Sequence, residues 1–289
     1  MFGAALPSEP PPPKSEADLP AYVRAAGAIK VTCHAREGRT SAATVRQEGA
    51  LRIRFPNSHG PHLEATLINV AGGAAGGDHF KVSIEAMAGA NVVVSTPAAE
   101  KIYRAIEAPA VVETALVAAA GTRLAWLPQE TILFDRSRLV RRLNVNLAPD
   151  ATLTLSEMTI LGRTDMGEAL VSGAFQDQWR VRRGTRLIYA EATRLDGPIA
   201  SILEKSAVGA GARAFATVLR VSPDAEAMID RAREKIANFA NTGCEAGVSA
   251  YDGMIVARFI GQTGFELRRA VTHYLGLFDD LVLPRVWNS

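Results

Sequence analysis

The chain has 289 residues, 48% of them apolar and 21% charged, and its 32 basic and 30 acidic side chains give a formal charge of +2. This composition excludes wholesale disorder, and the mixed charges argue against nucleic-acid or membrane-surface binding. Two cysteines, Cys33 and Cys244, are too few for a disulfide framework and favour a reducing compartment. No apolar run reaches the roughly 20 residues of a membrane span, and no secretion signal is recognisable, so we expect a cytoplasmic protein.

The first 20 residues are rich in proline and carry few large apolar groups, which predicts a flexible tail. Residues 21–289 are expected to form one β-rich domain. Apolar and polar residues alternate over 51–55, and Phe80, Val82 and Ile84 alternate in the same way, as on half-exposed strands.

An internal similarity runs through the middle of the chain. A small turn element followed by an apolar strand recurs at 88–91, 120–122, 148–150 and 209–212. A strand also precedes each of the first three turns, which predicts stacked antiparallel hairpins. The fold class expected is therefore mainly β, with the hairpins in a helical, solenoid-like arrangement, and an ordinary β-sandwich is the alternative.

Near the C-terminus the apolar period becomes helical. A first amphipathic helix is predicted from about Met228 until Gly243, after the start signal Ser222-Pro223-Asp224. Asp252-Gly253 then predicts a hairpin with a type I′ turn, and a second helix is expected from about Phe265 to Leu281.

The glycine-rich segment Gly72–Asp78 has the spacing of a phosphate-binding loop but lacks its Lys and Ser/Thr. A strand pattern follows where that loop needs a helix, so we expect a crossover between strands that binds no nucleotide. Asp78 has two equal interpretations, as a cap of this turn or as a buried functional carboxylate.

Candidate chemistry elsewhere is sparse. Cys33, His59 and His62 are weak candidates for a metal site because their spacing matches no ligand motif. No serine or cysteine occupies a nucleophile motif, so a catalytic triad is not recognised. Acidic residues recur in apolar strand surroundings, namely Glu130, Asp135, Glu157, Glu168 and Glu191. Two of them in an open cleft would suit a carbohydrate hydrolase, although structural acids are commoner.

Several segments together resemble one family, the urease accessory proteins of the UreD type, also called UreH. They are Gly72-Gly73 with Gly76–Asp78, the segments 95–104 (STPAAEKIYR) and 126–135 (WLPQETILFD), Leu161-Gly162-Arg163 with Gly167-Glu168, and the closing 283–287 (LPRVW). The resemblance spans roughly residues 27–287. It implies a mainly β, helically stacked fold with two helices, and a role in maturation without catalysis.

The resemblance further implies that the chain binds apo-urease and UreF, reaches the GTPase UreG through UreF, and helps nickel reach the urease active site. Ni²⁺ would be in transit along an internal polar path, with no stably bound cofactor. Because carboxylates in an apolar core need pairing or hydration, the candidates for the path or an interface are Asp78, Glu130, Asp135, Glu157, Glu168 and Glu191. The alternatives are a stable nickel-binding metallochaperone using Cys33, His59 and His62, and a β-solenoid carbohydrate hydrolase.

Overall fold

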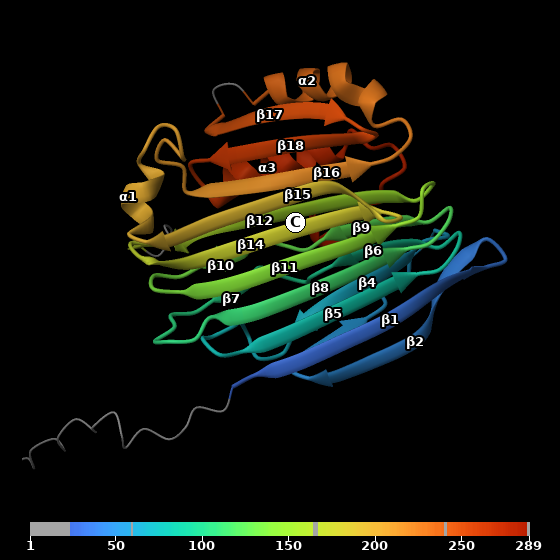
Figure 1. The fold of residues 1–289 in the computed structure, drawn as a ribbon, viewed down its shortest axis with the longest axis horizontal. Helices are drawn as coiled ribbons and strands as arrows, with labels where there is room; N and C mark the ends of the chain where they lie inside the picture. Colours follow the sequence, from blue (N-terminus) through green and yellow to red (C-terminus); the bar gives the residue numbers. More distant parts are fainter. Residues whose placement is uncertain (1–23, 59, 164–166, 240–241, 288–289) are drawn as a thin grey trace, which may run out of the picture.

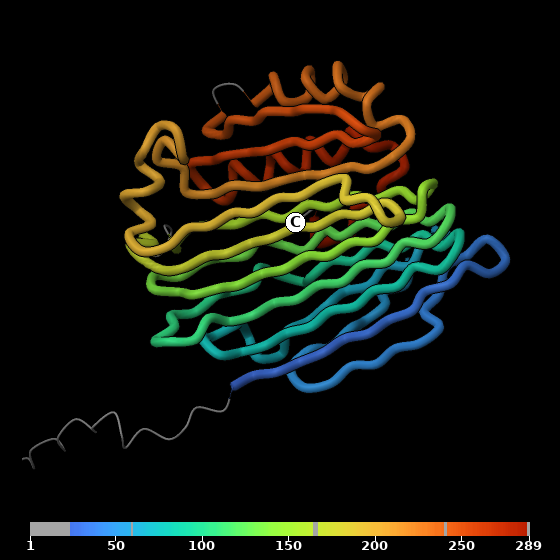
Figure 2. The backbone as a smooth tube through the Cα atoms, in the orientation of Figure 1, coloured from blue at the N-terminus to red at the C-terminus, as the bar shows by residue number. Residues whose placement is uncertain are grey.

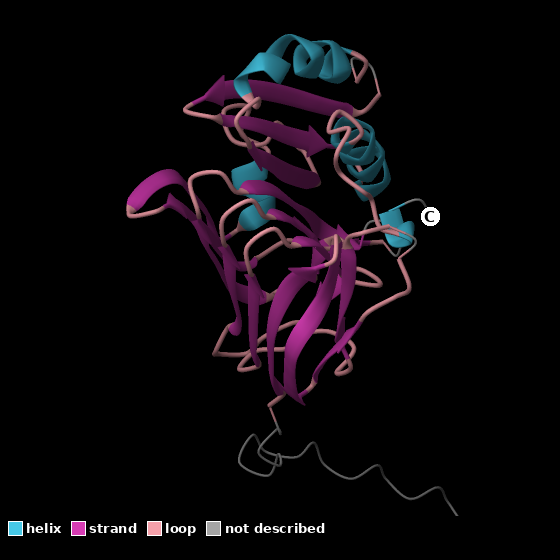
Figure 3. Ribbon diagram, turned by 90° about the vertical axis from the view of Figure 1, so that its right-hand side faces the viewer, coloured by secondary structure: helices cyan, strands magenta, loops and turns pink. Residues whose placement is uncertain are grey.

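The computed structural model describes residues 24–58, 60–163, 167–239 and 242–287 (Figure 1). The predicted tail over residues 1–20 therefore lies outside the described residues, as does His59. Two β-sheets face each other as layers (Figure 3), and the prediction of a mainly β, solenoid-like fold with two C-terminal helices is confirmed.

The first sheet has seven strands in the order β15 (Arg186–Gly197), β14 (Gly173–Arg183), β11 (Arg138–Leu147), β8 (Ala110–Ala118), β5 (His79–Ala86), β1 (Ala26–Arg36) and β2 (Arg39–Gly49). The second has eleven strands. Its main path is β17 (Cys244–Tyr251), β18 (Met254–Gly261), β16 (Ala214–Val221), β12 (Thr152–Arg163), β9 (Arg123–Leu127), β6 (Asn91–Ser95), β4 (Leu63–Asn69) and β3 (Leu51–Arg54). The short strands β7 (Glu100–Ile102), β10 (Thr131–Leu133) and β13 (Glu168–Ala169) pair beside this path.

The repeated unit is a coil of the chain that passes from one sheet to the other, as the tube in Figure 2 traces. Strand β5 lies in the first sheet and β6 in the second, and the next coil places β8 and β9 directly beside them. These neighbours are parallel: His79 pairs with Val111, and Val111 with Val140, at an offset of about 30 residues.

The predicted antiparallel pairing within each unit is therefore wrong. Strands β5 and β6 pack face to face, with inward side chains such as Ile84 and Val94 in one core, instead of edge to edge. Their backbone groups pair with the equivalent strands of adjacent coils, which satisfies both edges. Antiparallel hairpins occur where the first sheet ends, as β1–β2 and β14–β15.

Three of the four predicted turns form the corners between the sheets. Gly89 and Gly121 have φ angles of 73° and 63°, which favour glycine. A hydrogen bond also joins two neighbouring corners, since the Gly121 amide donates to Oδ2 of Asp150 at 3.0 Å. The fourth turn, 209–212, differs because it joins the short helix α1 (Ile199–Leu203) to β16.

The two longer helices cover the outer face of the eleven-stranded sheet (Figure 3). Helix α2 (Ile229–Ala237) is shorter than predicted. Helix α3 (Gly264–Leu275) ends just before its capping residue Gly276, whereas the prediction extended it to Leu281. Thr263 begins α3 by accepting the Glu266 amide. The predicted hairpin is confirmed, since Tyr251 pairs with Met254 and the two residues between them have positive φ.

The segment Gly72–Asp78 joins β4 to β5 as predicted. Asp78 is buried, and its carboxylate accepts the Ala25 amide at 2.8 Å and the Ala75 amide at 2.7 Å. Of the two interpretations, capping of the turn is the one that these contacts support.

Gly73→Ala is expected to lower the free energy of unfolding by about 3 kcal/mol, because φ is 143° and a Cβ atom would overlap the Tyr103 ring and lie 2.7 Å from the Lys101 carbonyl. Gly72→Ala is the matched control, since its φ is 76° but nothing lies within 4 Å, and a loss of about 1 kcal/mol is expected. Urea unfolding of both variants measures the difference. Equal losses would show that the contact with Tyr103 does not constrain this turn.

Candidate functional site: a polar band between the sheets

Polar side chains cross the core between the two sheets at one level of the stack. In the first sheet Arg141 pairs in register with Asp177, and Asp177 with Thr193. In the facing sheet Glu157 pairs with Thr217, and Thr217 with Arg258. We call these residues, together with Glu191, the polar band. Because side chains alternate along a strand, each side chain of the polar band points inward, like the apolar core residues two positions away on the same strand.

Arg141 is the centre of the band. Its guanidinium donates to both oxygens of Asp177, at 3.1 and 2.7 Å, and to the Thr131 hydroxyl at 3.1 Å. The same group lies 3.0 Å from Oε2 of Glu157, and all three charged side chains are buried. One cation is thus shared by two carboxylates, which leaves the cluster one negative charge in excess when both are ionised.

Glu157 carries that excess. The Trp126 indole donates to its Oε1 at 2.9 Å, whereas its Oε2 accepts no well-directed hydrogen bond from the described residues. Burial raises the pKa of Glu157 to about 7, against the attraction of Arg141, and the neighbouring Asp177 carboxylate adds to the rise. Glu157 therefore keeps its proton to a higher pH than an exposed glutamate does.

Glu191 lies at one end of the band. Its carboxylate accepts hydrogen bonds from the hydroxyl groups of Tyr189 and Thr217 and from the Arg258 guanidinium. A hollow of about 230 Å³, which Glu191, Thr217 and Arg258 help to line, lies between β15 and the strands β16 and β18. This end of the band therefore opens toward the surface.

A cavity of about 100 Å³ continues the polar interior on the other side of Arg141 and Glu157. Polar groups line it from several coils, namely Asn69, Thr96, Glu100, Thr114, Gln129 and Thr131. Burial raises the pKa of Glu100 to about 7, although the Asn69 amide donates to its carboxylate at 3.1 Å. The two carboxylates with strongly raised pKa values thus line the same cavity.

The raised pKa of Glu157 predicts a pH dependence of stability. The folded protein holds this proton more tightly than the unfolded chain, so the contribution is present below about pH 4.5 and is lost as pH rises through about 7. Relative to Glu157→Gln, which keeps the neutral form, the wild type should lose unfolding free energy between these values. Urea unfolding at pH 5 and pH 8 measures the difference.

Glu113→Gln is the matched control for this titration. Glu113 lies on the outer face of β8, where the hydrogen bond with His79 lowers the pKa of its carboxyl. Its contribution therefore has the opposite sign, being lost as pH falls. A wild-type minus Glu157→Gln difference that is constant with pH would contradict the raised pKa of Glu157.

Of the other predicted acids, Glu130 anchors the C-terminal segment. Arg268 of α3 donates to Oε1 of Glu130 at 2.8 Å and to the Val286 carbonyl, and its guanidinium lies over the Trp287 ring. The Trp287 indole donates to the Leu127 carbonyl at 3.0 Å. Glu130 thus fixes the end of the chain to the sheet and lies outside the polar band.

Asp135 and Glu168 lie close together at the end of the stacked coils where strands β10 and β12 end. One Asp135 oxygen accepts the amides of Val171 and Ser172, and Glu168 accepts the Asp135 amide while pairing with Arg163. These two carboxylates and Asp78 satisfy backbone amides at loops. The structure therefore brings only Glu157 and Glu191, of the six predicted acids, into the polar band.

The weak metal candidates do not converge in the described part of the chain, where no group of three His, Cys, Asp or Glu side chains is placed to hold an ion. Cys33 is buried in β1, and burial raises the pKa of its thiol to about 12, so the metal-binding thiolate is disfavoured. His62 is buried, and His59 lies outside the described residues.

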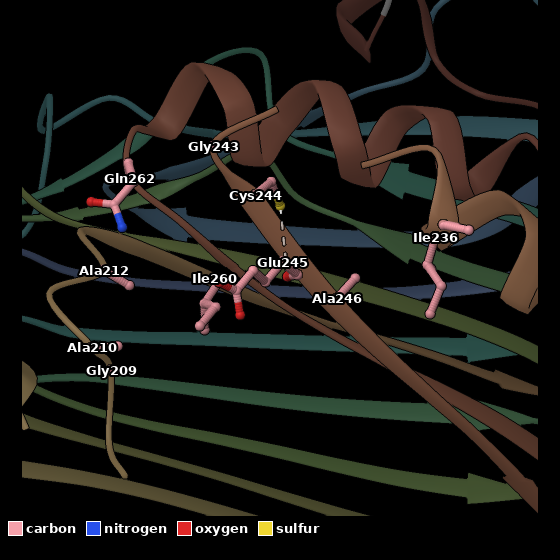
Figure 4. A pocket seen from close by; sticks show the side chains of 11 residues that line it. Gly209, Ala210, Ala212, Ile236, Gly243, Cys244, Glu245, Ala246, Ile260 and Gln262 are labelled. Carbon is pink, nitrogen blue, oxygen red and sulfur yellow. Dashed lines mark hydrogen bonds between the residues drawn. The ribbon is translucent and has the colours of Figure 1, made fainter. Parts of the chain in front are cut away.

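A further hollow, of about 480 Å³, lies between the loop 209–212, the end of α2 and the paired ends of β17 and β18 (Figure 4). Small residues line most of it, with Glu245 and Gln262 as its longer polar side chains. Burial raises the pKa of Cys244, the thiol at this hollow, to about 11. No polar groups converge here as they do in the band.

The hydrolase alternative requires two carboxylates in an open cleft. Glu157 and Asp177 are close neighbours through Arg141, but both are buried between the sheets. Asp135 and Glu168 do line an open hollow, but Asp135 accepts two backbone amides and Glu168 pairs with Arg163, so both carboxylates are engaged in holding loops. The geometry therefore does not support that alternative.

Arg141, Asp177 and Glu100 were missed by sequence reasoning. Arg141 lies in phase with the buried Leu139 and Leu143, and Asp177 with Phe175 and Trp179. A charged residue at an inward position of a strand was thus the signal that could have identified the first two. Glu100 lay within a segment that carried the family resemblance.

Comparison with known proteins gives a consistent result. Residues 25–288 match the family model described as UreD urease accessory protein. A protein named Urease accessory protein UreD from Azorhizobium caulinodans is 44% identical to this chain, over 94% of this chain and 99% of that protein. A protein of the same name from Rhodopseudomonas palustris strain BisB18 is 45% identical to this chain, over 95% of this chain and 98% of that protein. A protein named Urease accessory protein UreD 3 from Bradyrhizobium sp. strain BTAi1 is 45% identical over 96% and 98%.

Proposed function

Since the chain belongs to the UreD family of urease accessory proteins, we propose that it acts in urease maturation as a non-catalytic scaffold. In this proposal it binds apo-urease and UreF, and reaches UreG through UreF. Nickel crosses the protein on its way to the urease active site, as cargo and not as a resident cofactor. In the described chain no helix has the length and apolar character needed to span a membrane.

The observation that carries the nickel path is the charge excess at Glu157. Two buried carboxylates share the single guanidinium of Arg141, so the three groups carry a net charge of −1 between the sheets when Glu157 is ionised. Transfer of a net charge into an apolar core is costly, and a divalent cation or its hydration water offsets that cost. Entry of Ni²⁺ would therefore favour loss of the Glu157 proton.

The remaining polar groups extend this path in both directions. Glu191 lies at the hollow beside β15, and Glu100 lies on the far side of the cavity. Carboxylates, hydroxyls and water are oxygen ligands that a divalent ion accepts, and their spacing along the interior favours passage over retention.

Co-purification tests the partners directly. The tagged chain is expressed with UreF, UreG and apo-urease, singly and together. We expect UreF and apo-urease each to elute with the chain, and UreG to elute only when UreF is present. If none of them elutes with the wild-type chain, the proposed scaffold function is wrong.

A further inference from the structure

The described loop residues 72–78, 103–109, 134–137 and 167–172, which precede β5, β8, β11 and β14, are stacked at one end of the molecule, at the left in Figure 1. Between three of them lies an open hollow of about 520 Å³ whose lining includes Tyr103, Arg104, Phe134, Arg136 and Arg163. The Tyr103 and Phe134 rings meet edge to face at 5.2 Å, and the Arg163 guanidinium lies 4.1 Å above Phe134. The floor of the hollow is thus an ordered aromatic and arginine cluster.

The two acidic groups at this hollow, Asp135 and Glu168, are already engaged. Glu168 pairs with Arg163, and Asp135 accepts two backbone amides. Arg136 is 63% exposed, and its Nε lies 3.7 Å from Asp135, which makes a weak solvent-screened pair. The side chain of Arg104 is exposed and makes no hydrogen bond or ion pair with any residue that the structure describes. The hollow therefore presents two guanidinium groups for an anionic partner.

The backbone at Arg136 gives an independent indication. Its φ angle is 59°, in the left-handed region that favours glycine, so an arginine there is strained. Strained backbone of this kind often occurs at functional sites. The strain is held in place because the Arg136 amide donates to Ser172 and its carbonyl accepts from Ala105.

Exposed apolar residues belong to the two loops that Arg136 joins. Ile106 follows Ala105 and is 71% exposed, and Val171 precedes Ser172 and is 57% exposed. Arg136 is hydrogen-bonded to both loops, and each exposed apolar residue is the direct chain neighbour of one of its two partners, Ala105 and Ser172. Arginine and tyrosine beside exposed apolar groups are the composition of a protein–protein contact.

We propose that Tyr103, Arg104, Ile106, Arg136 and Val171, the end surface, bind a partner protein through a segment that carries carboxylates beside apolar side chains. The exposed apolar residues favour a protein over a nucleic acid, whose phosphates would gain nothing from Ile106 and Val171.

The end surface lies next to the Glu100 end of the interior cavity. The Tyr103 hydroxyl donates to the Gly72 carbonyl at 2.9 Å, and Asn69 donates both to the Gly73 carbonyl and to Glu100. A partner bound at the end surface would therefore lie next to the Glu100 end of the proposed nickel path. The inference rests on the proposed function, because the partners tested are UreF and apo-urease.

Binding of the purified full-length chain to UreF and to apo-urease, each measured at low and moderate salt, tests the end surface. Arg104→Glu and Arg136→Glu are expected to weaken binding to one of these partners by at least about tenfold, with a smaller salt dependence. Arg136→Gly is the decisive variant, since it relieves the left-handed backbone. Its melting temperature should equal or exceed that of the wild type, while the same partner binds more weakly.

Arg46→Glu, at an exposed arginine of β2, is the matched control and should bind like the wild type. If the Arg104 and Arg136 variants bind both partners as the wild type does, the end surface is not a docking site. Binding of a single-stranded RNA 20-mer that these variants abolish would assign the arginines to nucleic acid and also overturn the inference. If the wild type binds neither partner, the proposed function fails and the inference fails with it.

Discussion

Arg141→Met is expected to lower the free energy of unfolding by about 3–5 kcal/mol, because it leaves two buried carboxylates without their cation. Glu157 and Asp177 both depend on this guanidinium, and no other Lys or Arg among the described residues forms an ion pair with either of them. Protonation can relieve the repulsion, so the loss should be smaller at pH 5 than at pH 8. Urea unfolding at both pH values measures the effect.

Arg142→Met is the matched control at the next position of β11. Arg142 faces outward, is 47% exposed, and pairs with Glu113 at 3.4 Å, so its replacement should cost less than about 1 kcal/mol. Adding Glu157→Gln and Asp177→Asn to Arg141→Met should recover part of the lost stability, since both buried charges are then absent. A loss in Arg141→Met no larger than that in Arg142→Met would show that the polar band is not a buried ionic cluster.

The second large effect is expected in urease activation. Combined replacement of Glu157 and Glu191 by glutamine should lower urease activity in cells by about 10–100-fold, the range found when groups that orient or attract a metal are removed. The fold should persist, because Arg141 retains its bidentate pair with Asp177 and glutamine resembles the neutral acid. Urease activity is measured per amount of urease, with the chain and its partners quantified.

The control for this experiment replaces two outward carboxylates on the same sheet, Glu113 of β8 and Asp196 of β15, by glutamine and asparagine. Both lie in surface ion pairs, with side-chain exposures of 38% and 52%. This control variant should activate urease as the wild type does. Normal activation by the interior variant, with the complex still assembled, would remove Glu157 and Glu191 from the path.

Sequence patterns sufficed for the local elements and for the class of the fold. Alternation identified β3 and β5, helical spacing identified α2 and α3, and Asp252-Gly253 identified the last hairpin. The sheet pairing was not predictable in the same way. A tight glycine turn is compatible both with a hairpin and with a corner between facing sheets, and the choice depends on contacts between coils about 30 residues apart.

The candidate site was predicted only in part for a similar reason. The apolar surroundings of Glu157 and Glu191 marked them as unusual, but they did not show that Arg141 and Asp177 lie at the same level of the stack. Asp78 and Asp135 stand in equally suggestive segments, yet their oxygens cap backbone amides. Whether a carboxylate meets an amide or a guanidinium depends on the register between strands, which a single sequence does not contain.

Delivery of nickel to urease by this chain and its partners can be measured as the nickel content of purified urease. The urease is taken from cells that produce urease, UreF and UreG, with or without the chain. We expect urease nearly free of nickel without the chain, and full nickel content when the wild-type chain is restored. Equal nickel content in the presence and absence of the chain would show that the chain does not deliver nickel.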